Sequence, residues 1–417
     1  MNPRTFIAAT WALALIPAVH GADEALDQAS PSDSPPKQER RYIEIAPNDQ
    51  IPTVRAILPI GGPNAFFLNH RGQIGVAKFS PGLSQIGWEL YSEVKLHALP
   101  SLALGPGYSV IAASPLELTQ AFDTNQDVEL DFFQALVRDW PGQSEGVTIT
   151  AGPVIDTHGR VLFALSPHAL KDGDVAKARI VAWQPDRTEI ETVTESELPV
   201  EDFVVRRDGL LAARLSMPDY KDGYFLSLTE LPPPLPENSE TPAGPLPFTL
   251  PSLIIPAELT GHALPIQPTF FEEDGKGKLL LTCPESRHLI EIVPEKAGGL
   301  WQGAILLRGR SPKPVYALAE MEPGAILGGG DEGFLPLNDS DPSYRILSAA
   351  LANDGLLLRF NQPVDRYSAV KAENYSVKAI ALGGGETSLS LEPLIESDGK
   401  TVLLRGQLPG PGNVLRI

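Results

Sequence analysis

Pairs of short apolar runs, each pair joined by a polar turn, recur through the middle of this chain of 417 residues. In each unit the first run leads into a turn that contains Asp or Asn and has Gly at or near its end, and a second apolar run follows. This pattern is typical of a β-hairpin. Segments with helical periodicity are scarce, so a Rossmann or TIM-barrel fold has little support. The turns lie at residues 69–72, 156–159, 206–209 and 272–277.

The long spacing between these hairpins predicts a β-propeller, in which each hairpin belongs to a blade and the polar turns lie on a rim. The propeller segment is 51–342, and a Pro-rich stretch at 231–262 is expected to be an insertion loop. At roughly 40 to 45 residues a blade, the remaining length predicts about six blades. The expected fold class is therefore all-β.

A second pattern begins after the propeller segment. Residues 343–417 contain short strands separated by turns, and their number suits a small immunoglobulin-like (Ig-like) β-sandwich. The stretch 354–365, an apolar strand that continues into Phe360 and the dipeptide Pro363-Val364, resembles bacterial Ig-like modules. That resemblance implies a spacer or an adhesive unit.

The N-terminus has the pattern of a secretory signal. Arg4 precedes an apolar run at 6–19, and the small residues Gly21 and Ala22 follow, so we expect a signal peptide at 1–21. Residues 22–50 are rich in Pro, Ser and Asp and are expected to form a disordered linker. A bilayer span needs about 20 apolar residues, so we expect no transmembrane span in the mature chain. The protein would be exported to the periplasm, the cell surface or the medium.

Composition restricts the partners and cofactors. The formal charge is −19, and a chain this acidic repels nucleic acid and anionic lipid. Cys283, the one cysteine, lies in an apolar run and is expected to be a buried strand residue rather than a reactive thiol. One cysteine excludes an intrachain disulfide, the C-x-x-C-H attachment of c-type haem and a multi-cysteine zinc site.

An acidic loop is a candidate calcium site. Asp123, Asn125 and Asp127 place oxygen ligands at alternate positions, and Asp131 adds a fourth beyond them. Ca²⁺ takes about six to eight oxygens at about 2.3 to 2.6 Å. The segment departs from the EF-hand loop because it lacks the turn glycine and the Glu at the twelfth position. A solvated acidic turn is the alternative interpretation.

Two further patterns are interpreted structurally. Residues 328–333 match G-x-G-x-x-G, but a dinucleotide site needs a helix immediately after the motif, and Pro336 prevents one. We interpret this segment as a turn between strands.

The His residues are scattered without metal-ligand spacing. They are interpreted as surface or turn residues: His70, His158, His262 and His288.

The centre of the chain resembles one family. The run 115–131, followed by Trp140 and by the Gly-Pro-Val element at 152–154, is similar to quinoprotein glucose or sorbosone dehydrogenase-like propellers, and residues 300–304 are similar to a Gln-Gly-Ala element of the same group. The resemblance implies a propeller whose central face could hold pyrroloquinoline quinone (PQQ) and oxidise a sugar. It also implies a catalytic His shortly before the Gly-Pro-Val element, which takes the hydroxyl proton while hydride passes to the quinone.

Two features depart from the pattern of that family. Val147 stands at about the position of the catalytic His, and the Arg-Asn dipeptide associated with cofactor binding does not occur in the chain. A general base contributes about 10²- to 10⁴-fold in rate, and valine can accept no proton. His158, the nearest replacement in sequence, is expected on a rim. We therefore expect catalysis to be lost or weak.

The sequence favours an exported propeller, related to quinoprotein sugar dehydrogenases, that binds a ligand or partner at the cell envelope. Carbohydrate and envelope proteins are the expected classes of partner. Two alternatives stay open. One is a PQQ-dependent sugar or alcohol dehydrogenase that uses different residues, and the other is a structural cell-surface module.

Overall fold

The computed structural model of this chain describes two ranges of residues. They are 12–15 and 53–417, apart from 84–85, 91–95, 97–98, 125–129, 168–176, 186–188, 216–222, 235–245, 248–251, 257–258, 260–265, 274–275, 298–299, 323–324, 338–345, 382–384 and 410–412. The expected linker at 22–50 and most of the expected signal peptide lie outside the described residues. Helix is rare in the described part, and none of its helices is long and apolar enough to cross a membrane.

The first three sheets are meanders of neighbouring antiparallel strands. The first contains β2 (Val54–Gly61), β3 (Asn64–Asn69), β4 (Ile74–Phe79) and β5 (Ile86–Leu90). The second contains β6 (Leu102–Leu104), β7 (Val110–Ser114), β8 (Glu117–Phe122) and β9 (Phe132–Val137). The third contains β10 (Val147–Ile155), β11 (Val161–Pro167), β12 (Ala178–Trp183) and β13 (Glu191–Ser196), to which β17 (Leu246–Pro247) adds in parallel. Three 3-10 turns, η1 (Pro81–Leu83), η2 (Pro106–Tyr108) and η3 (Gln143–Glu145), lie in the connections.

The next three sheets continue the same order. The fourth contains β14 (Val200–Val205), β15 (Leu210–Leu215), β16 (Gly223–Glu230) and β18 (Leu253–Pro256). The fifth contains β19 (Ile266–Glu273), β20 (Lys276–Cys283), β21 (His288–Ala297) and β22 (Leu300–Arg310). The sixth contains β23 (Val315–Glu322), β24 (Ala325–Gly330) and β25 (Gly333–Pro336). The stretch 231–262 is therefore not a loop throughout, because it supplies β17 and the last strand of the fourth sheet.

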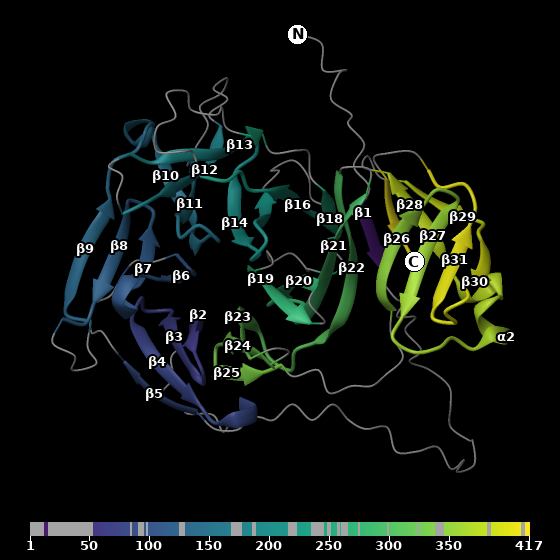
Figure 1. The fold of residues 1–417 in the computed structure, drawn as a ribbon, viewed down its shortest axis with the longest axis horizontal. Coiled ribbons are helices and arrows are strands. Elements are labelled where there is room, and N and C mark those ends of the chain that lie inside the picture. The colour runs from purple at the N-terminus through teal and green to yellow at the C-terminus, as the bar shows by residue number, and fades with distance from the viewer. Residues whose placement is uncertain are drawn as a thin grey trace, which may run out of the picture.

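The first strands of these sheets close a ring. β2 contacts β6, β6 contacts β10, β10 contacts β14, β14 contacts β19, β19 contacts β23, and β23 returns to β2. Figure 1 shows the sheets arranged around this ring, with β6 and β23 toward the middle and β5 and β9 on the outside. The prediction of an all-β propeller is confirmed.

Buried side chains fill the space between neighbouring sheets all the way round the ring. Where the ring closes, the Phe67 ring of the first sheet packs edge-on against Phe334 of the sixth, with centroids 5.3 Å apart. Burying one such side chain stabilises the fold by about 1.5 to 3 kcal/mol. Because the chain has no disulfide, these inter-sheet cores are what hold the ring closed.

The G-x-G-x-x-G segment serves this packing. Gly330 and Gly333 pair across the tight turn between β24 and β25, as the sequence predicted. A Cβ atom on Gly329 would lie 2.5 Å from Cγ1 of Val54, so only glycine lets the first and sixth sheets approach this closely. The motif is structural.

The C-terminal residues form two small sheets that share a core. One has the order β26 (Ile346–Ala352), β27 (Gly355–Phe360), β31 (Thr401–Arg405) and β30 (Glu392–Ile395), and the other has β32 (Asn413–Arg416), β28 (Val377–Ala381) and β29 (Glu386–Leu389). The short helices α2 (Arg366–Ala369) and η4 (Ala372–Asn374) lie between β27 and β28. The unit is a small β-sandwich, and its Ig-like classification stays a prediction.

The sandwich is joined to the propeller through the outer strand of the fifth sheet. Ala304 and Leu306 of β22 belong to the core of the sandwich. The strand β1 (Ala12–Leu15) pairs in parallel with β22 on one side and with β32 on the other. Figure 1 shows β1 between the propeller and the sandwich.

Candidate functional site

Polar side chains of the first and sixth sheets meet where β2 and β23 begin. The Arg55 guanidinium at the start of β2 lies 4.1 Å from the centre of the Tyr316 ring at the start of β23. The Tyr316 hydroxyl donates to Asp331 over 2.9 Å, and the Thr53 hydroxyl donates to the same carboxylate over 3.2 Å. Burial raises the pKa of Tyr316, and the Asp331 carboxylate adds to this effect. The group links the first and sixth sheets.

The candidate calcium loop is only partly described. Asn125 and Asp127 lie outside the described residues. Asp131 accepts hydrogen bonds from the backbone N–H and the hydroxyl of Thr124, at 3.0 and 2.8 Å, and these bonds lower its pKa. Within the described residues no three His, Cys, Asp or Glu side chains converge as a metal site. The calcium site stays a prediction.

Val147, at the expected position of the catalytic base, is a packing residue. It begins β10, is 5% exposed and belongs to the core between the second and third sheets. Its carbonyl accepts a hydrogen bond of 2.9 Å from the Trp140 indole. His158 lies beyond the other end of β10, exposed in the turn before β11, where its backbone N–H donates to Asp156. The structure therefore does not bring these two positions together.

A buried ion pair lies in the same turn, and sequence reasoning missed it. Arg160 is fully buried, and its Nε donates to Asp156 over 2.7 Å. Its Nη2 donates to the Pro232 carbonyl over 2.9 Å, which fixes the start of the Pro-rich stretch against the third sheet. Both partners are enclosed by the fold, so the pair is structural.

A second polar cluster lies between the fourth and fifth sheets. Arg214 of β15 is buried, and its Nη1 lies 2.9 Å from the Glu201 carboxylate of β14. Burial raises the pKa of Tyr224 against the opposing effect of Arg214. Burial also raises the pKa of Cys283 to about 12, so its thiol is protonated at neutral pH. The expectation that Cys283 is a buried strand residue is confirmed.

His288 corrects the expectation of a surface or turn residue, because it is buried at the start of β21. Its Nδ1 lies 2.7 Å from the Leu259 carbonyl, and Nε2 accepts a 2.8 Å hydrogen bond from Arg310 Nε. A carbonyl only accepts, so Nδ1 carries the proton and the ring is neutral. Both ring nitrogens are occupied, and His288 is therefore no free base.

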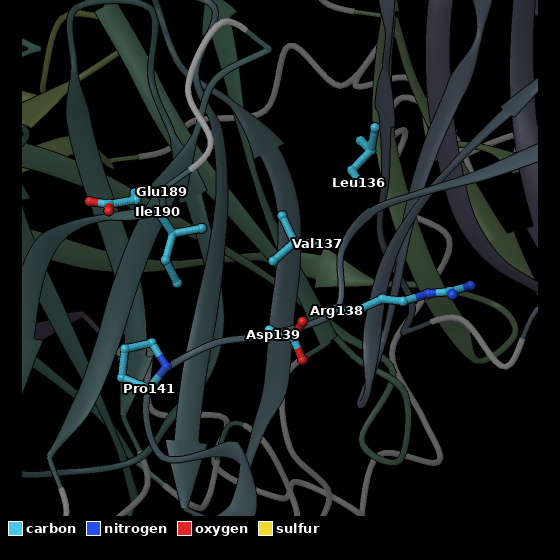
Figure 2. Close-up of a pocket in the computed structure, with 7 residues that line it drawn as sticks. All are labelled: Leu136, Val137, Arg138, Asp139, Pro141, Glu189 and Ile190. Atoms are coloured by element: carbon cyan, nitrogen blue, oxygen red, sulfur yellow. The ribbon is translucent and has the colours of Figure 1, made fainter.

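A hollow opens on the outside of the ring between the second and third sheets. It has a volume of about 400 Å³ and lies between the end of β9 and the residues that precede β13. In Figure 2 the side chains of Val137 and Ile190 point toward one another across this space, while Arg138 extends away from it. The lining residues are Leu136, Val137, Arg138, Asp139, Pro141, Glu189 and Ile190.

Charged side chains of both signs lie around the hollow. Arg138 lines the hollow, but its side chain extends away from the space and its Nε donates to Glu117 over 2.6 Å. Arg179 donates from Nη2 to the neutral Pro141 carbonyl over 3.2 Å, so its positive charge lies beside the hollow. Asp139 and Glu189 are exposed on opposite walls. Val137 and Ile190 therefore face one another in a hollow that is surrounded by charged groups of both signs. The walls of the hollow are about fifty residues apart in the chain, so no local sequence pattern predicts the hollow.

No protein-family model and no curated protein matches the chain. Among solved structures, the chain is similar to the PQQ domain of a pyranose dehydrogenase from Coprinopsis cinerea, with 9% identity, a TM-score of 0.46 and coverage of 69% of this chain and 92% of that one. A glucose dehydrogenase has 14% identity, a TM-score of 0.45 and coverage of 70% and 97%. A gluconolactonase from Xanthomonas campestris has 10% identity, a TM-score of 0.43 and coverage of 69% and 87%.

Proposed function

We propose that this protein is an exported binding module that holds an extended segment of a partner along β9, and that it does not oxidise sugars. The observation that carries the proposal is the hollow at the end of β9. A preformed concave space of this volume falls in the range of about 300 to 1,000 Å³ that ligand sites occupy. The β-propeller supplies a rigid frame for it.

The position of β9 supports this proposal. β9 is the outermost strand of the second sheet, and its outer edge has no neighbouring strand among the described residues. Its Phe132 side chain is 51% exposed, although it packs against Phe122 with ring centroids 5.9 Å apart. An open strand edge with exposed apolar side chains is a template for pairing with an added strand. An added strand that follows β9 would reach the hollow at Val137.

The packing of Val147 supports the proposal that the protein does not oxidise sugars. Sugar oxidation with a quinone requires a base that removes the hydroxyl proton, and a buried valine provides none. His158 does not replace this base, because it lies in an exposed turn at the far end of β10. The quinone enzyme that uses different residues is the competing function.

Site-directed crosslinking tests the binding role. Cys283 is buried and protonated, so a cysteine introduced at exposed Gln134 of β9 becomes the accessible thiol. A photo-crosslinker at Q134C should join one partner in envelope extracts, and the adduct should disappear when I190D is added. The matched control is Y367C on α2, where the parent side chain is 85% exposed. Equal adducts at both positions would contradict a specific surface.

An activity assay separates the competing function. With PQQ, sugar and an electron-acceptor dye, we expect no turnover that depends on both quinone and sugar. Turnover that is lost in H158A would establish the enzyme instead.

N-terminal sequencing of natively produced protein tests export. We expect the sequence to start at Ala22, and recovery of Met1 would refute export.

A further inference from the structure

We infer that removal of the signal peptide opens a slot between β22 and β32, and that the mature protein binds there an extended apolar segment of a partner, parallel to both strands. The slot is the position of β1, bounded by the residues that pair with it, 304–306 of β22 and 414–416 of β32. The inference rests on the proposed export, because β1 belongs to the expected signal peptide. It does not depend on the partner proposed for β9.

β1 shows how a strand occupies this slot. It pairs in parallel with β22 on one side and in parallel with β32 on the other, and Figure 1 shows it between the propeller and the sandwich. Its insertion joins the fifth sheet of the propeller to one sheet of the sandwich, so that both become part of one eight-stranded sheet. Because β22 and β32 run in the same direction, a strand that replaces β1 in this way runs parallel to both.

The slot is covered on both faces as well as on both edges. Besides its two pairing strands, β1 contacts β18 of the fourth sheet and β26 of the sandwich. Successive residues of a strand point to opposite faces. Ala304 and Leu306 belong to the core of the sandwich, whereas Ile305 belongs to the core that includes the fourth and fifth sheets. A strand in the slot therefore lies between two apolar cores.

These surroundings specify the chemistry of the occupant. A strand that is buried on both faces is a continuous apolar run rather than an alternating one. The sequence of β1, Ala-Leu-Ala-Leu, is such a run of four residues. Arg416 is the charged member of the six residues that pair with β1, and its Nη1 lies 3.2 Å from the Glu386 carboxylate. We therefore expect an uncharged apolar segment at least as long as β1.

Cleavage after Gly21 leaves the two edges without their strand. The backbone N–H and C=O groups that β22 and β32 direct at β1 then lose their partners, next to the core residues Ala304 and Leu415. Unpaired backbone groups and uncovered core side chains both raise the free energy. An added apolar strand satisfies both. The edge of a single strand offers one row of such groups, whereas this slot offers two rows that face one another.

A peptide-binding experiment on two forms of the protein tests the inference. One form starts at Ala22, and the other is the full chain, in which β1 fills the slot. The probe is a blocked, fluorescently labelled peptide with the sequence of residues 11–16 and two added lysines for solubility. Its matched counterpart carries N-methyl groups on the backbone nitrogens of both leucines, which keeps the side chains but removes two hydrogen-bond donors. Fluorescence anisotropy measures affinity, and hydrogen exchange locates the peptide.

The peptide should bind the form that starts at Ala22 at least about tenfold more tightly than it binds the full chain, and N-methylation should weaken binding by about tenfold. Bound peptide should slow exchange of the amides at 304–306 and 414–416. If the form that starts at Ala22 loses its fold, the peptide should restore it. Equal affinity for the two forms, equal affinity of the two peptides, or a lost fold that the peptide does not restore would overturn the inference.

Two further results separate this inference from the proposed function. Protection of these amides before any peptide is added would mean that the slot is closed or filled by the chain itself, and would overturn the inference alone. Peptide protection confined to β9 would overturn the inference and support the surface proposed there. Recovery of Met1 from natively produced protein would remove export and this inference together, because β1 would then stay in its slot.

Discussion

Individual buried polar residues were the hardest feature to predict. Cys283 was assigned correctly because the apolar run around it is visible in the sequence. His288 was not, because it contacts the Leu259 carbonyl and Arg310, which lie 29 and 22 residues away in the chain. Arg160 was missed for the same reason, since the Pro232 carbonyl that it binds lies 72 residues away. Contacts between residues this far apart in the chain produce no local sequence pattern.

The buried pair of Arg160 and Asp156 gives a prediction about stability. Replacing Arg160 with Met keeps the methylene stem but leaves a buried carboxylate without its cation, which should cost about 3 to 5 kcal/mol of unfolding free energy. The exposed pair of Arg138 and Glu117 is the control, and R138M should cost about 0 to 1 kcal/mol. Urea unfolding measures both. Equal losses would show that burial does not govern these pairs.

The thiol of Cys283 gives a prediction about reactivity. Burial raises its pKa to about 12, above its usual value, so the thiolate is scarce at pH 8. The native protein should therefore react with a thiol reagent far more slowly than the urea-unfolded protein does. The measurement is the rate of colour release from a disulfide reagent. Comparable rates for native and unfolded protein would contradict the burial.

At the scale of elements, the hairpins were predicted because their turns carry local signals. The turns at 156–159 and 206–209 join β10 to β11 and β14 to β15, as the Asp and Gly residues indicated. The Pro-rich stretch misled the prediction. Its apolar run Leu253–Pro256 forms β18, an outer strand, where proline at the end of the strand is tolerated.

The close approach of the first and sixth sheets depends on a glycine in β24. G329A adds a Cβ atom 2.5 Å from Val54 Cγ1, and such overpacking should cost about 1 to 3 kcal/mol. In β5, G87A meets no atom within 4 Å and should change stability by less than about 1 kcal/mol. V54A should restore part of the loss in G329A, which a double-mutant cycle detects. No loss in G329A would contradict the tight junction.

The acidic loop between β8 and β9 gives a prediction about calcium. If Asp123, Asn125, Asp127 and Asp131 bind Ca²⁺, binding to the native state raises stability by mass action. The melting temperature should rise with added Ca²⁺, and the rise should vanish in D127A. Calorimetric melting curves that coincide with Ca²⁺ and with chelator would remove calcium from the account.

At the scale of the whole molecule, the ring was predictable and the candidate site was not. The repeated hairpins specify sheets, and sheets with apolar faces must pack on one another. The hollow depends on how two neighbouring sheets meet, and its walls come from residues 136–141 and 189–190. The joint with the β-sandwich was equally hidden, because Ala304 and Leu306 belong to a propeller strand yet pack in the core of the sandwich.

Removal of the expected signal peptide would alter that joint. Cleavage after Gly21 takes away β1, which pairs with both β22 and β32. The facing edges of these two strands would then lack a partner, while the sandwich core beneath them would still include Ala304 and Leu306.

Hydrogen exchange tests whether a partner binds along β9. It is compared between protein recovered from the cell envelope with its partner bound and the same protein after the partner is removed. Backbone amides of a strand that gains a partner exchange more slowly. We expect the bound form to be protected in β9 and at residues 189–190. Protection confined to the starts of β2 and β23, around Arg55 and Tyr316, would place the ligand at the centre of the ring and contradict it.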